Sequence, residues 1–318
     1  MTTTSNGKLF GRAYSLTIIP PSVPGDYSKL NKGTAYGNTN SKAPIRIGFD
    51  INQNNKPKEN KGKFELYNLS LATRQSIGRG AQIVFDAGYQ ATHGVVFSGL
   101  VKQVHFERRG PDIVTILEAD DGGSNIICSH IDQHFPRGST WATIVQAIAT
   151  AMGTPYPYNP VPASIGGCIG VPSFVFPRGF VAHGKCSTVL TTLCRKFGLD
   201  WFILNGAINI VPQTMHNGDT AVLISSKTGM IGVPSRSTGS MIKFTSLLNP
   251  KLVPARLVQL VSVDKTLNGY YKVLGIKVEG DTHDSKWQTE CECIALASGG
   301  AKQTAKVATG GNIASGES

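Results

Sequence analysis

Short runs of β-forming residues, each bounded by turn residues, fill the first and last thirds of the 318-residue chain, whereas the middle mixes helix and strand patterns. Many short strands separated by turn signals are typical of small barrels and sandwiches. In the first third the runs are residues 10–19, 43–51, 63–70, 81–89, 94–106 and 112–120. In the last third they are residues 241–250, 255–263, 269–280 and 286–297. The sequence therefore predicts a mainly β protein (α+β) with two similar β-units around a small mixed α/β insert.

This pattern divides the chain into four stretches. Residues 1–121 form the first β-unit, 122–234 the mixed middle, and 235–297 the second β-unit. Residues 298–318, rich in Gly and Ala, cannot form a core alone and are expected to be an extended tail. Within the first unit the apolar alternation slips by one position at Gly99, which predicts a β-bulge there.

Helix caps and turn residues place the elements of the middle stretch. Ser139 or Thr140 is a suitable N-cap for a helix that ends at Gly153. A second amphipathic helix is expected over about 187–198. Directly after it, Asn205-Gly206 between two apolar runs predicts a tight β-hairpin.

Positive charge is concentrated at the N-terminal end. The formal net charge is +11, and residues 1–64 hold ten Lys or Arg against three acidic residues, a net +7. This excess fits a nucleic-acid patch, a basic flank that docks an acidic partner, or a solvated surface. The stripe of aromatic and basic residues that single-strand binders use is missing, which argues against nucleic-acid recognition. The loop at 23–43 is long enough to suspect a contact role.

The cysteines and the hydropathy pattern bear on the compartment. None of the cysteines has CxxC spacing, which favours buried free thiols made in a reducing compartment. They are Cys128, Cys168, Cys186, Cys194, Cys291 and Cys293. No apolar run reaches the roughly 18 residues that span a membrane, and the N-terminus lacks the regions of a signal peptide. We expect a cytosolic product, or one released by lysis, without membrane insertion.

The segment VEGDTHDSKW, residues 278–287, carries the most suggestive polar cluster. Asp281, His283 and Asp284 could bind a metal if their side chains converged, and Cys291 and Cys293 follow shortly after. A solvent-facing hairpin turn does not favour such convergence, and Gly-Asp is a common start of a turn. We interpret the segment as a structural turn between two strands.

The segment CSHIDQH, residues 128–134, is a second metal candidate. On a helix, His130 and His134 would share one face beside Asp132. The Glu of the HExxH motif is absent and Pro136 argues against a continuing helix. We interpret this segment as a polar connector.

Two further patterns imitate known sites. His183, Cys186 and Asp200 could be arranged as a thiol triad, but Cys186 leads into the second helix and Asp200 begins a strand. GGCIG, residues 166–170, resembles half of a dinucleotide-binding fingerprint, but Pro172 interrupts it and no strand leads into it.

A group of carboxylates around the hairpin of the first unit could imitate a glycosidase pair. They are Glu107, Glu118, Asp120 and Asp121. Two of them are adjacent in sequence and diverge on a strand. Taken together, the motifs require no catalytic residue, no cofactor and no metal, and we expect the chain not to be an enzyme.

Several weak motifs in a fixed order resemble the baseplate hub proteins of contractile bacteriophage tails. In the first unit they are IRIGFDI, KFELYNLS, TRQSIGRGAQIVFDAGY, VVFSGLVKQV and GPDIVTILEADDG. In the second they are LLNPKLVPARLVQL and NGYYKVLGIKVEGDTHDSKWQTECECIAL. The resemblance covers roughly residues 8–297, and the basic N-terminal third with its long loop departs from the family.

The resemblance implies two tail-tube-like β-barrel domains in each chain. Three copies would form a homotrimeric ring whose six barrels match the sixfold tail tube, with a threefold central spike below and DNA only passing through the lumen. Wedge or sheath-proximal baseplate proteins are further partners. The expected place is the virion tail, assembled in the host cytoplasm.

Two other functions stay open. One is a tail-tip hub of a non-contractile phage or of a secretion machine built on the same tube, and the other is a tail-associated glycan-binding or hydrolytic protein. In the hub interpretation the bulky aromatic residues divide between barrel cores and subunit contacts. They are Tyr67, Tyr89, Phe97, Trp201, Tyr270, Tyr271 and Trp287.

Overall fold

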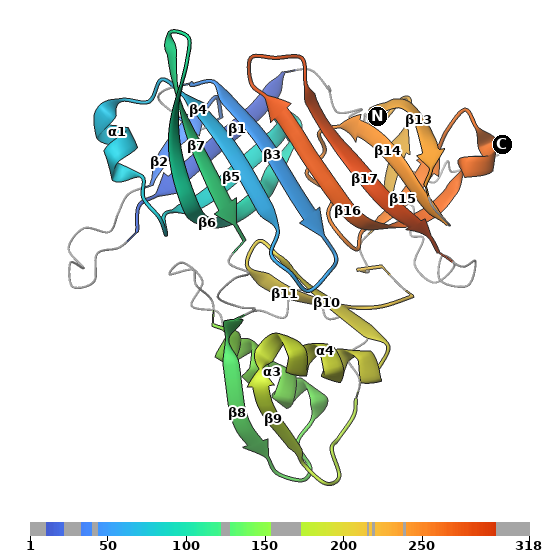
Figure 1. Ribbon diagram of the computed structural model, residues 1–318. Helices are drawn as coiled ribbons and strands as arrows, with labels where there is room; N and C mark the ends of the chain where they lie inside the picture. Colours follow the sequence, from blue (N-terminus) through green and yellow to red (C-terminus); the bar gives the residue numbers. More distant parts are fainter. Residues whose placement is uncertain are drawn as a thin grey trace, which may run out of the picture.

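The computed structural model describes residues 11–21, 33–39, 44–121, 128–153, 173–214, 216–217, 220–237 and 240–296. The protein is mainly β, as the sequence predicts, with two sets of strands side by side and a small mixed part beneath them (Figure 1). The loop segment 22–32, the segment GGCIG, Cys168 and the tail 298–318 lie outside the described residues.

The two sets of strands belong to one thirteen-stranded sheet. The first set consists of β1 (Arg12–Ile19), β2 (Thr34–Gly37), β3 (Ile47–Asn54), β4 (Lys61–Tyr67), β5 (Gln82–Tyr89), β6 (Thr92–Arg109) and β7 (Asp112–Asp120), with the short helix α1 (Leu71–Ser76) after β4. The second consists of β12 (Val222–Ser225), β13 (Met230–Arg236), β14 (Met241–Leu247), β15 (Leu257–Val261), β16 (Gly269–Asp281) and β17 (Trp287–Ala295), with a 3-10 turn at Lys265–Leu267.

The two sets have the same strand order. In the first, hydrogen-bonded neighbours follow one another as β3-β4-β7-β6-β5-β1, with β2 added at the edge. In the second they follow as β13-β14-β17-β16-β15-β12. The last pair differs, because β1 lies antiparallel to β5 whereas β12 lies parallel to β15. Apart from that pair, the second unit repeats the first strand by strand.

The repeat extends to single residues. Lys63 on β4 lies opposite Glu118 on β7, and Lys243 on β14 lies opposite Glu292 on β17. Directly after each of these glutamates the partner strand bulges, between Val101 and Gln103 on β6 and between Val273 and Gly275 on β16. A bulge at the same place in both hairpins aligns Gln103 with Gly275, so that 103–109 of β6 corresponds to 275–281 of β16.

The two units are joined edge to edge within the chain. β3 pairs antiparallel with the second half of β16, from Gly275 opposite Asn54 to Asp281 opposite Gly48. Seven residue pairs therefore connect the first and last thirds of the sequence. The hydrophobic core is also shared, since one cluster of buried side chains runs from Tyr14 through Phe85 to Cys293. The units are thus parts of one folded body.

The middle of the chain forms its own small core beneath the sheet (Figure 1). It contains β8 (His130–Phe135), α3 (Trp141–Met152), β9 (Phe180–Lys185), α4 (Cys186–Lys196) and the hairpin β10 (Leu199–Leu204) and β11 (Ala207–Pro212). The α3 helix begins and ends as predicted: the Thr140 hydroxyl accepts a hydrogen bond from the N–H of Thr143, and Gly153 follows with φ +64°. Asn205 and Gly206 both have positive φ, as a two-residue hairpin turn of type I′ requires.

Several sequence expectations need correction. The loop expected at 23–43 contains the strand β2, which pairs with β1. The register slip predicted at Gly99 is instead a pair of bulges on either side of it, one between Val95 and Phe97 against β5 and one at Lys102 against β7. Strands β12 and β13, which fall in or across the end of the 122–234 stretch, pair with the second β-unit. The division at 121 and 234 otherwise stays a prediction about domains.

Gly99 is needed for close approach of two strands rather than for a special backbone angle. A Cβ at this position would lie 2.2 Å from the carbonyl oxygen of Asp120 on β7, where no movement of a side chain can relieve it. We expect Gly99→Ala to lower the free energy of unfolding by about 2 kcal/mol or more, measured by urea denaturation. The matched variant Gly78→Ala, whose Cβ would meet nothing within 4 Å, should leave stability unchanged. Equal stabilities of the two variants would contradict this account.

Candidate functional site

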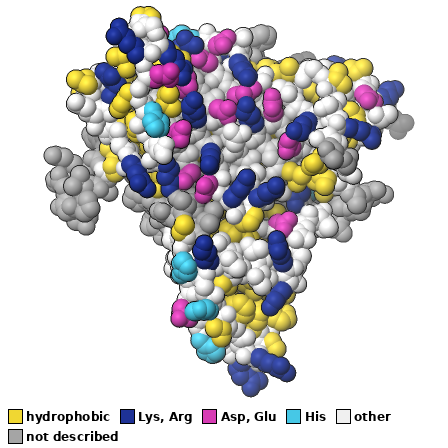
Figure 2. Space-filling view, in the orientation of Figure 1, with side chains coloured by type: hydrophobic (Ala, Val, Ile, Leu, Met, Phe, Trp, Pro, Cys, Tyr) yellow, Lys and Arg dark blue, Asp and Glu magenta, His cyan; other side chains and the backbone are white. Residues whose placement is uncertain are grey.

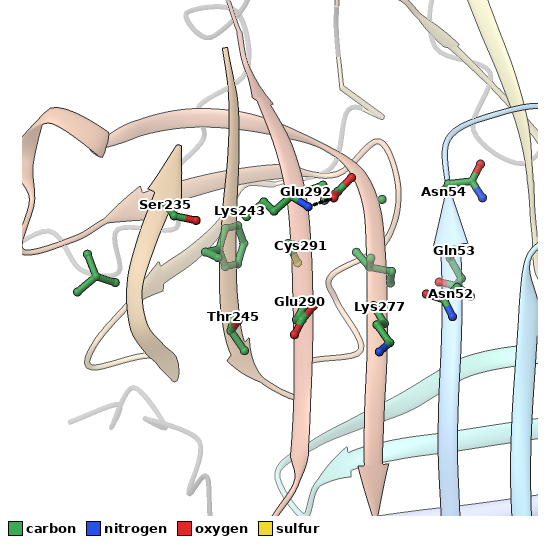
Figure 3. Close-up of a pocket in the computed structure, with 14 residues that line it drawn as sticks. Asn52, Gln53, Asn54, Ser235, Lys243, Thr245, Lys277, Glu290, Cys291 and Glu292 are labelled. Carbon is green, nitrogen blue, oxygen red and sulfur yellow. Dashed lines mark ion pairs between the residues drawn. The ribbon is translucent and has the colours of Figure 1, made fainter. Parts of the chain in front are cut away.

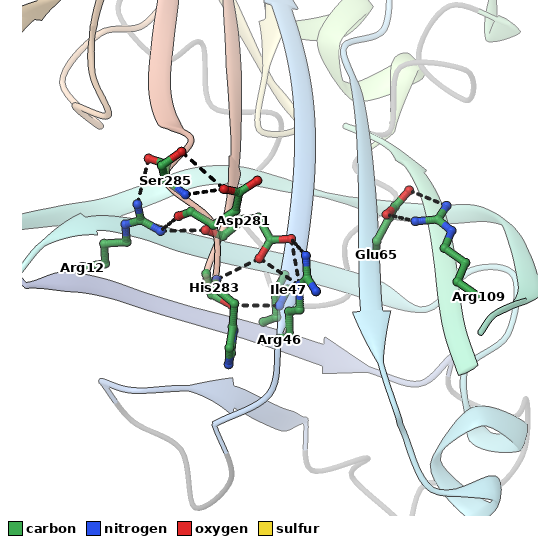
Figure 4. Close-up of polar contacts among 10 residues, drawn as sticks. Arg12, Arg46, Ile47, Glu65, Arg109, Asp281, His283 and Ser285 are labelled. Carbon is green, nitrogen blue, oxygen red and sulfur yellow. Dashed lines mark hydrogen bonds and ion pairs between the residues drawn. The ribbon is translucent and has the colours of Figure 1, made fainter. Parts of the chain in front are cut away.

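The GDTHDSK segment is the turn between β16 and β17, and it lies against the first β-unit (Figure 4). The Asp281 carboxylate accepts hydrogen bonds from Arg46 Nε at 3.0 Å and from the N–H of His283 at 2.8 Å, and Arg46 Nη2 lies 2.9 Å from Asp281 Oδ2. Thr282 and Ile47 exchange two further bonds, each 3.0 Å long. The turn is therefore bonded to the chain just before and within β3.

A second arginine holds the same turn from β1. Arg12 donates to the carbonyl oxygens of Asp281 at 2.8 Å, of Ser285 at 2.9 Å and of Asp284 (Figure 4). Its guanidinium lies 5.2 Å from the centre of the Trp287 ring, a cation–π contact. We call Arg12 and Arg46 the arginine clamp. It fixes the β16–β17 hairpin to the first unit at the end of the β3–β16 ladder.

These contacts oppose a metal site in the turn. The Asp281 carboxylate is taken by Arg46, and His283 Nδ1 lies 2.9 Å from the Thr282 hydroxyl. Cys291 and Cys293 are buried in β17, and burial raises the pKa of both thiols, which disfavours the thiolate that a metal requires. Among the described residues no three His, Cys, Asp or Glu side chains gather as metal ligands would. The interpretation of a structural turn agrees with this geometry.

The segment 130–135 is a strand, not the connector expected from sequence. His130, Asp132 and His134 alternate along β8 and are exposed. Asp132 pairs with His183 of β9 at 3.3 Å on the surface. His130 and His134 share one face of this strand, but at about 3.3 Å per residue they lie about 13 Å apart, whereas a helix would have brought them together.

The three residues of the possible thiol triad have different surroundings. His183 contacts Asp132, Cys186 is buried at the start of α4, and Asp200 accepts a hydrogen bond from Gln213 at 3.0 Å. Among the described residues, no hydrogen bond or ion pair joins the three side chains.

The carboxylates of the first hairpin have different surroundings. Glu107 pairs with Arg109 at 2.9 Å, Asp120 pairs with Lys102 at 3.1 Å, and Glu118 is exposed on the sheet. Asp121 is fully buried and accepts hydrogen bonds from the backbone N–H of Asn60 at 3.1 Å and from its side chain at 2.7 Å. Glu107, Asp120 and Asp121 are thus each bound by a basic or amide side chain, and Glu118 and Asp120 line the same hollow of the sheet.

Asp121 belongs instead to a polar connection between the sheet and the small middle part. The Asn60 side chain, held by Asp121, also donates to the carbonyl of Ile203 on β10 at 2.7 Å. The side-chain oxygen of Asn205 accepts from the N–H of Ser98 on β6 at 2.9 Å. Buried Lys272 of β16 donates to the carbonyls of Pro212 and Gln213 at 3.1 and 3.3 Å.

These three contacts reach both β-units, because Asn60 and Ser98 belong to the first and Lys272 to the second. Burial lowers the pKa of Lys272, against the nearby charge of Asp200. A buried polar group that lost its partner would cost free energy, so this arrangement fixes where the middle part sits. We call the β3–β16 ladder that joins the two units the seam. The small part is attached beneath this seam.

The exposed face of the joined sheet is polar and hollowed. One hollow of about 570 Å³ spans β13, β14, β17, β16 and β3 (Figure 3). Another of about 650 Å³ spans β3, β4, β6 and β7. The basic residues of this face are mostly paired with acidic ones: Lys243 with Glu292, Lys277 with Asp50 and Glu279, and Lys102 with Asp120. Figure 2 shows both signs of charge interspersed over this face. Such a face has no strong field of one sign that would hold nucleic acid.

The aromatic residues divide as expected in part. Five are buried in the cores, namely Tyr89, Phe97, Trp201, Tyr271 and Trp287. Tyr67 and Tyr270 are half-buried, and the guanidinium of Arg46 lies 4.5 Å from the Tyr67 ring centre. Which of them contacts another subunit stays a prediction.

The arginine clamp was not found by sequence reasoning, which counted Arg12 and Arg46 only as part of the basic N-terminal stretch. Arg46 and Asp281 are 235 positions apart, so no spacing motif links them. The available signal was weak: a basic residue at the start of each of two strands, and an acidic hairpin turn elsewhere. The clamp shows that at least two of the ten basic residues serve contacts within the chain.

Comparison with solved structures supports a fold assignment. A tail protein from Neisseria meningitidis superposes with a TM-score of 0.58 at 10% identity, covering 90% of this chain and 97% of that one. The 43 kDa tail protein of prophage MuSo2 from Shewanella oneidensis gives 0.58 at 10% identity, covering 89% and 98%.

A type VI secretion component from E. coli, described as similar in structure to the T4 bacteriophage tail proteins gp27 and gp5, gives a TM-score of 0.53 at 10% identity over 82% of this chain and 76% of that one. The chain has the fold of these proteins. No family model matches the sequence, and no curated protein matches it. In the described part of the chain, no helix is long and apolar enough to cross a membrane.

The arginine clamp generates a test of the seam. Asp281→Asn keeps the size of the side chain but removes the charge that binds Arg46, and we expect a loss of about 1 to 2 kcal/mol in unfolding free energy. Hydrogen exchange should speed up in the β16–β17 turn and in β3. The control Glu292→Gln removes the charge of an exposed pair with Lys243 and should leave both measurements unchanged. Unaltered exchange in the Asp281 variant would show that the clamp does not hold the seam.

Asp121 generates a pH prediction. Burial raises its pKa from 3.8 to about 7, against the hydrogen bonds from Asn60 that favour the charged form. The folded state therefore binds this proton more tightly than the unfolded state, and stability falls as the pH rises from about 4 to 7. At about 1.4 kcal/mol per pH unit, the loss is on the order of 3 kcal/mol.

The measurement is urea unfolding of the wild type and of Asp121→Asn at several pH values. The variant lacks this titration. The difference between its free energy of unfolding and that of the wild type should therefore rise in favour of the variant as the pH rises to 7, and stay constant above pH 7. Curves that stay parallel across this range would contradict the assignment.

Proposed function

We propose that this protein is a structural hub of a phage tail baseplate. Three copies would form a ring that joins the sixfold tail tube to a threefold central spike, with DNA passing through the lumen. The partners in this proposal are two further copies of the chain, the tail tube protein and the spike protein. Wedge or sheath-proximal baseplate proteins are additional candidates. The protein would act in the virion tail, after assembly in the host cytoplasm.

One observation carries the proposal: the strand order of the first unit is repeated in the second. A chain with two equivalent units gives six equivalent positions in a threefold ring, which is what a join between sixfold and threefold neighbours requires. The likeness in fold to phage tail proteins supports the same conclusion.

The contacts within the chain suit this role. The β3–β16 ladder and the arginine clamp make the pair of units one rigid piece, and the buried contacts of Asn60 and Lys272 hold the middle part beneath their seam. The balanced charges of the polar sheet face would let a polyanion pass without being held. A non-enzymatic role is part of this proposal, and the fold likeness to phage tail proteins supports it.

A secretion machine built on a similar tube is the second candidate. The fold likeness to the E. coli type VI secretion component favours it. So does the likeness to a Francisella complex that contains VgrG, which superposes with a TM-score of 0.53 at 8% identity over 91% of this chain and 59% of that one. The hub geometry would be the same, and the tube and spike would belong to a different assembly.

Averaged electron microscopy of the particle that contains this protein tests the proposal. We expect density for three copies between tube and spike, and a sheath around the tube if the tail is contractile. Light scattering of the purified chain should give the mass of a trimer. Turnover of peptidoglycan or polysaccharide that disappears in Glu118→Gln would instead establish the hydrolytic alternative.

A further inference from the structure

Among the strand edges that no described strand covers, two belong to equivalent places in the repeated strand order. The first half of β6 pairs with β5 up to Leu100, but its second half, Gln103–Arg109, pairs with β7 alone. At the other end of the strand order, β13 pairs with β14 alone. Exposed strand edges of this kind are usually blunted, covered or paired with another chain.

The repeat shows what covers the equivalent edges inside the chain. Residues 103–109 of β6 correspond to 275–281 of β16, and these pair with β3. β3 in turn corresponds to β13, because Asp50 and Ser235 both lie opposite the equivalent lysines Lys63 and Lys243. The covered edges thus form one seam within the chain, and the uncovered edges are the two halves of a second seam.

Side-chain burial agrees with this correspondence. Val278 on β16 is 2% exposed where β3 covers it, whereas Phe106, at the equivalent position on β6, is 55% exposed. On β13, Ile231 and Val233 are 42% and 65% exposed. Apolar side chains are thus uncovered on both free edges.

The free edge of β6 is held in place by contacts behind it. Arg109 binds the Glu65 carboxylate on β4 with two hydrogen bonds of 2.7 and 3.2 Å, and it also binds Glu107 (Figure 4). The edge is therefore pre-formed for pairing and need not be ordered on contact.

We infer that the Gln103–Arg109 edge of one copy pairs with β13 of a second copy, antiparallel and in the register of the β16–β3 seam. This inference rests on the proposed ring and names the surfaces that form it. Because each copy contributes β6 at one side and β13 at the other, the contact is head to tail, as a closed ring requires.

The register follows from the seam within the chain. Glu279 lies opposite Asp50, Val278 opposite Ile51 and Lys277 opposite Asn52. The equivalent pairs between copies are Glu107 with Ser235, Phe106 with Arg236 and His105 with Ser237.

The backbone of β13 allows this ladder with one backbone hydrogen bond missing. Ser237 donates its N–H to Met241 on β14, so by alternation Ser235 also turns its backbone to β14, while Arg236 and Pro234 face the free edge. Pro234 has no N–H to donate, and proline in sheets is confined to such edge positions. Glu107 and Ser235 would then be a pair without mutual hydrogen bonds, the closer kind, about 4.5 Å between Cα atoms. That distance is within the range of a disulfide.

The test is disulfide formation between copies. In a chain with Cys128→Ser and Cys168→Ser, two single variants, Glu107→Cys and Ser235→Cys, are prepared separately, mixed and oxidised. We expect a covalent dimer in the mixture and little in either variant alone. The double variant should give a covalent trimer on a denaturing gel.

Two matched controls accompany the test. Asn52→Cys with Lys277→Cys places the same kind of pair in the seam within one chain and should form a disulfide that does not change the chain's mass, which shows that oxidation was effective. Phe106→Cys mixed with Ser235→Cys should not cross-link, because neighbouring residues of a strand point to opposite faces.

A second variant tests the same surface without cysteines. Phe106→Asp places a charge on the exposed edge, and we expect the dissociation constant between copies to rise about 30-fold or more with the fold retained. Val181→Asp, at a position 61% exposed on β9 of the middle part, should leave association unchanged.

The outcomes separate this inference from the proposed function. A trimer by light scattering without the 107–235 cross-link, and unaffected by Phe106→Asp, would overturn the inferred surfaces and leave the hub intact. The cross-link in a protein that microscopy places outside the baseplate would support the surfaces and overturn the hub. A chain that stays monomeric at its highest soluble concentration and forms no cross-link would overturn the inference.

Discussion

The backbone ladder between β3 and β16 is the interaction on which the rest of this structure depends. It joins residues more than two hundred positions apart, and with it the two units share one sheet and one core. Backbone pairing alone would allow the strands to slide, but the arginine clamp fixes the end of the ladder through one carboxylate and several carbonyl groups. Register in this protein is therefore set by charge as well as by side-chain pattern.

The middle part is attached by both apolar and polar contacts. Its main core is separate, a small apolar cluster of Phe202, Val211 and Ala255 joins it to the second unit, and its polar contacts with the sheet come from a few buried groups around Asn60, Ser98 and Lys272. Buried hydrogen bonds are directional, so they define orientation more strictly than apolar packing does. Asp121 and Lys272 couple this orientation to pH. Burial raises the pKa of Asp121 and lowers the pKa of Lys272, which favours the neutral form of each group.

Local signals predicted the local structure well. Thr140 and Gly153 bound the α3 helix, Asn205-Gly206 forms the hairpin, and the GDTHDSK segment is a turn, since caps and turns depend on a few neighbouring residues. The β8 strand was missed because its alternation of apolar Ile131 and Phe135 is too short to separate from a loop. The seam and the clamp could not be predicted, because they depend on contacts between distant parts of the chain that leave no mark on spacing.

The helix α1 has a further consequence for any sixfold neighbour. It follows β4 in the first unit, whereas the equivalent position after β14 holds a turn at Asn249-Pro250. In the proposed ring of three chains, a helix and a proline turn would alternate. A neighbour made of six identical subunits would then meet two different local structures. Such a neighbour would have to bind features common to both structures, or bind every second site more weakly.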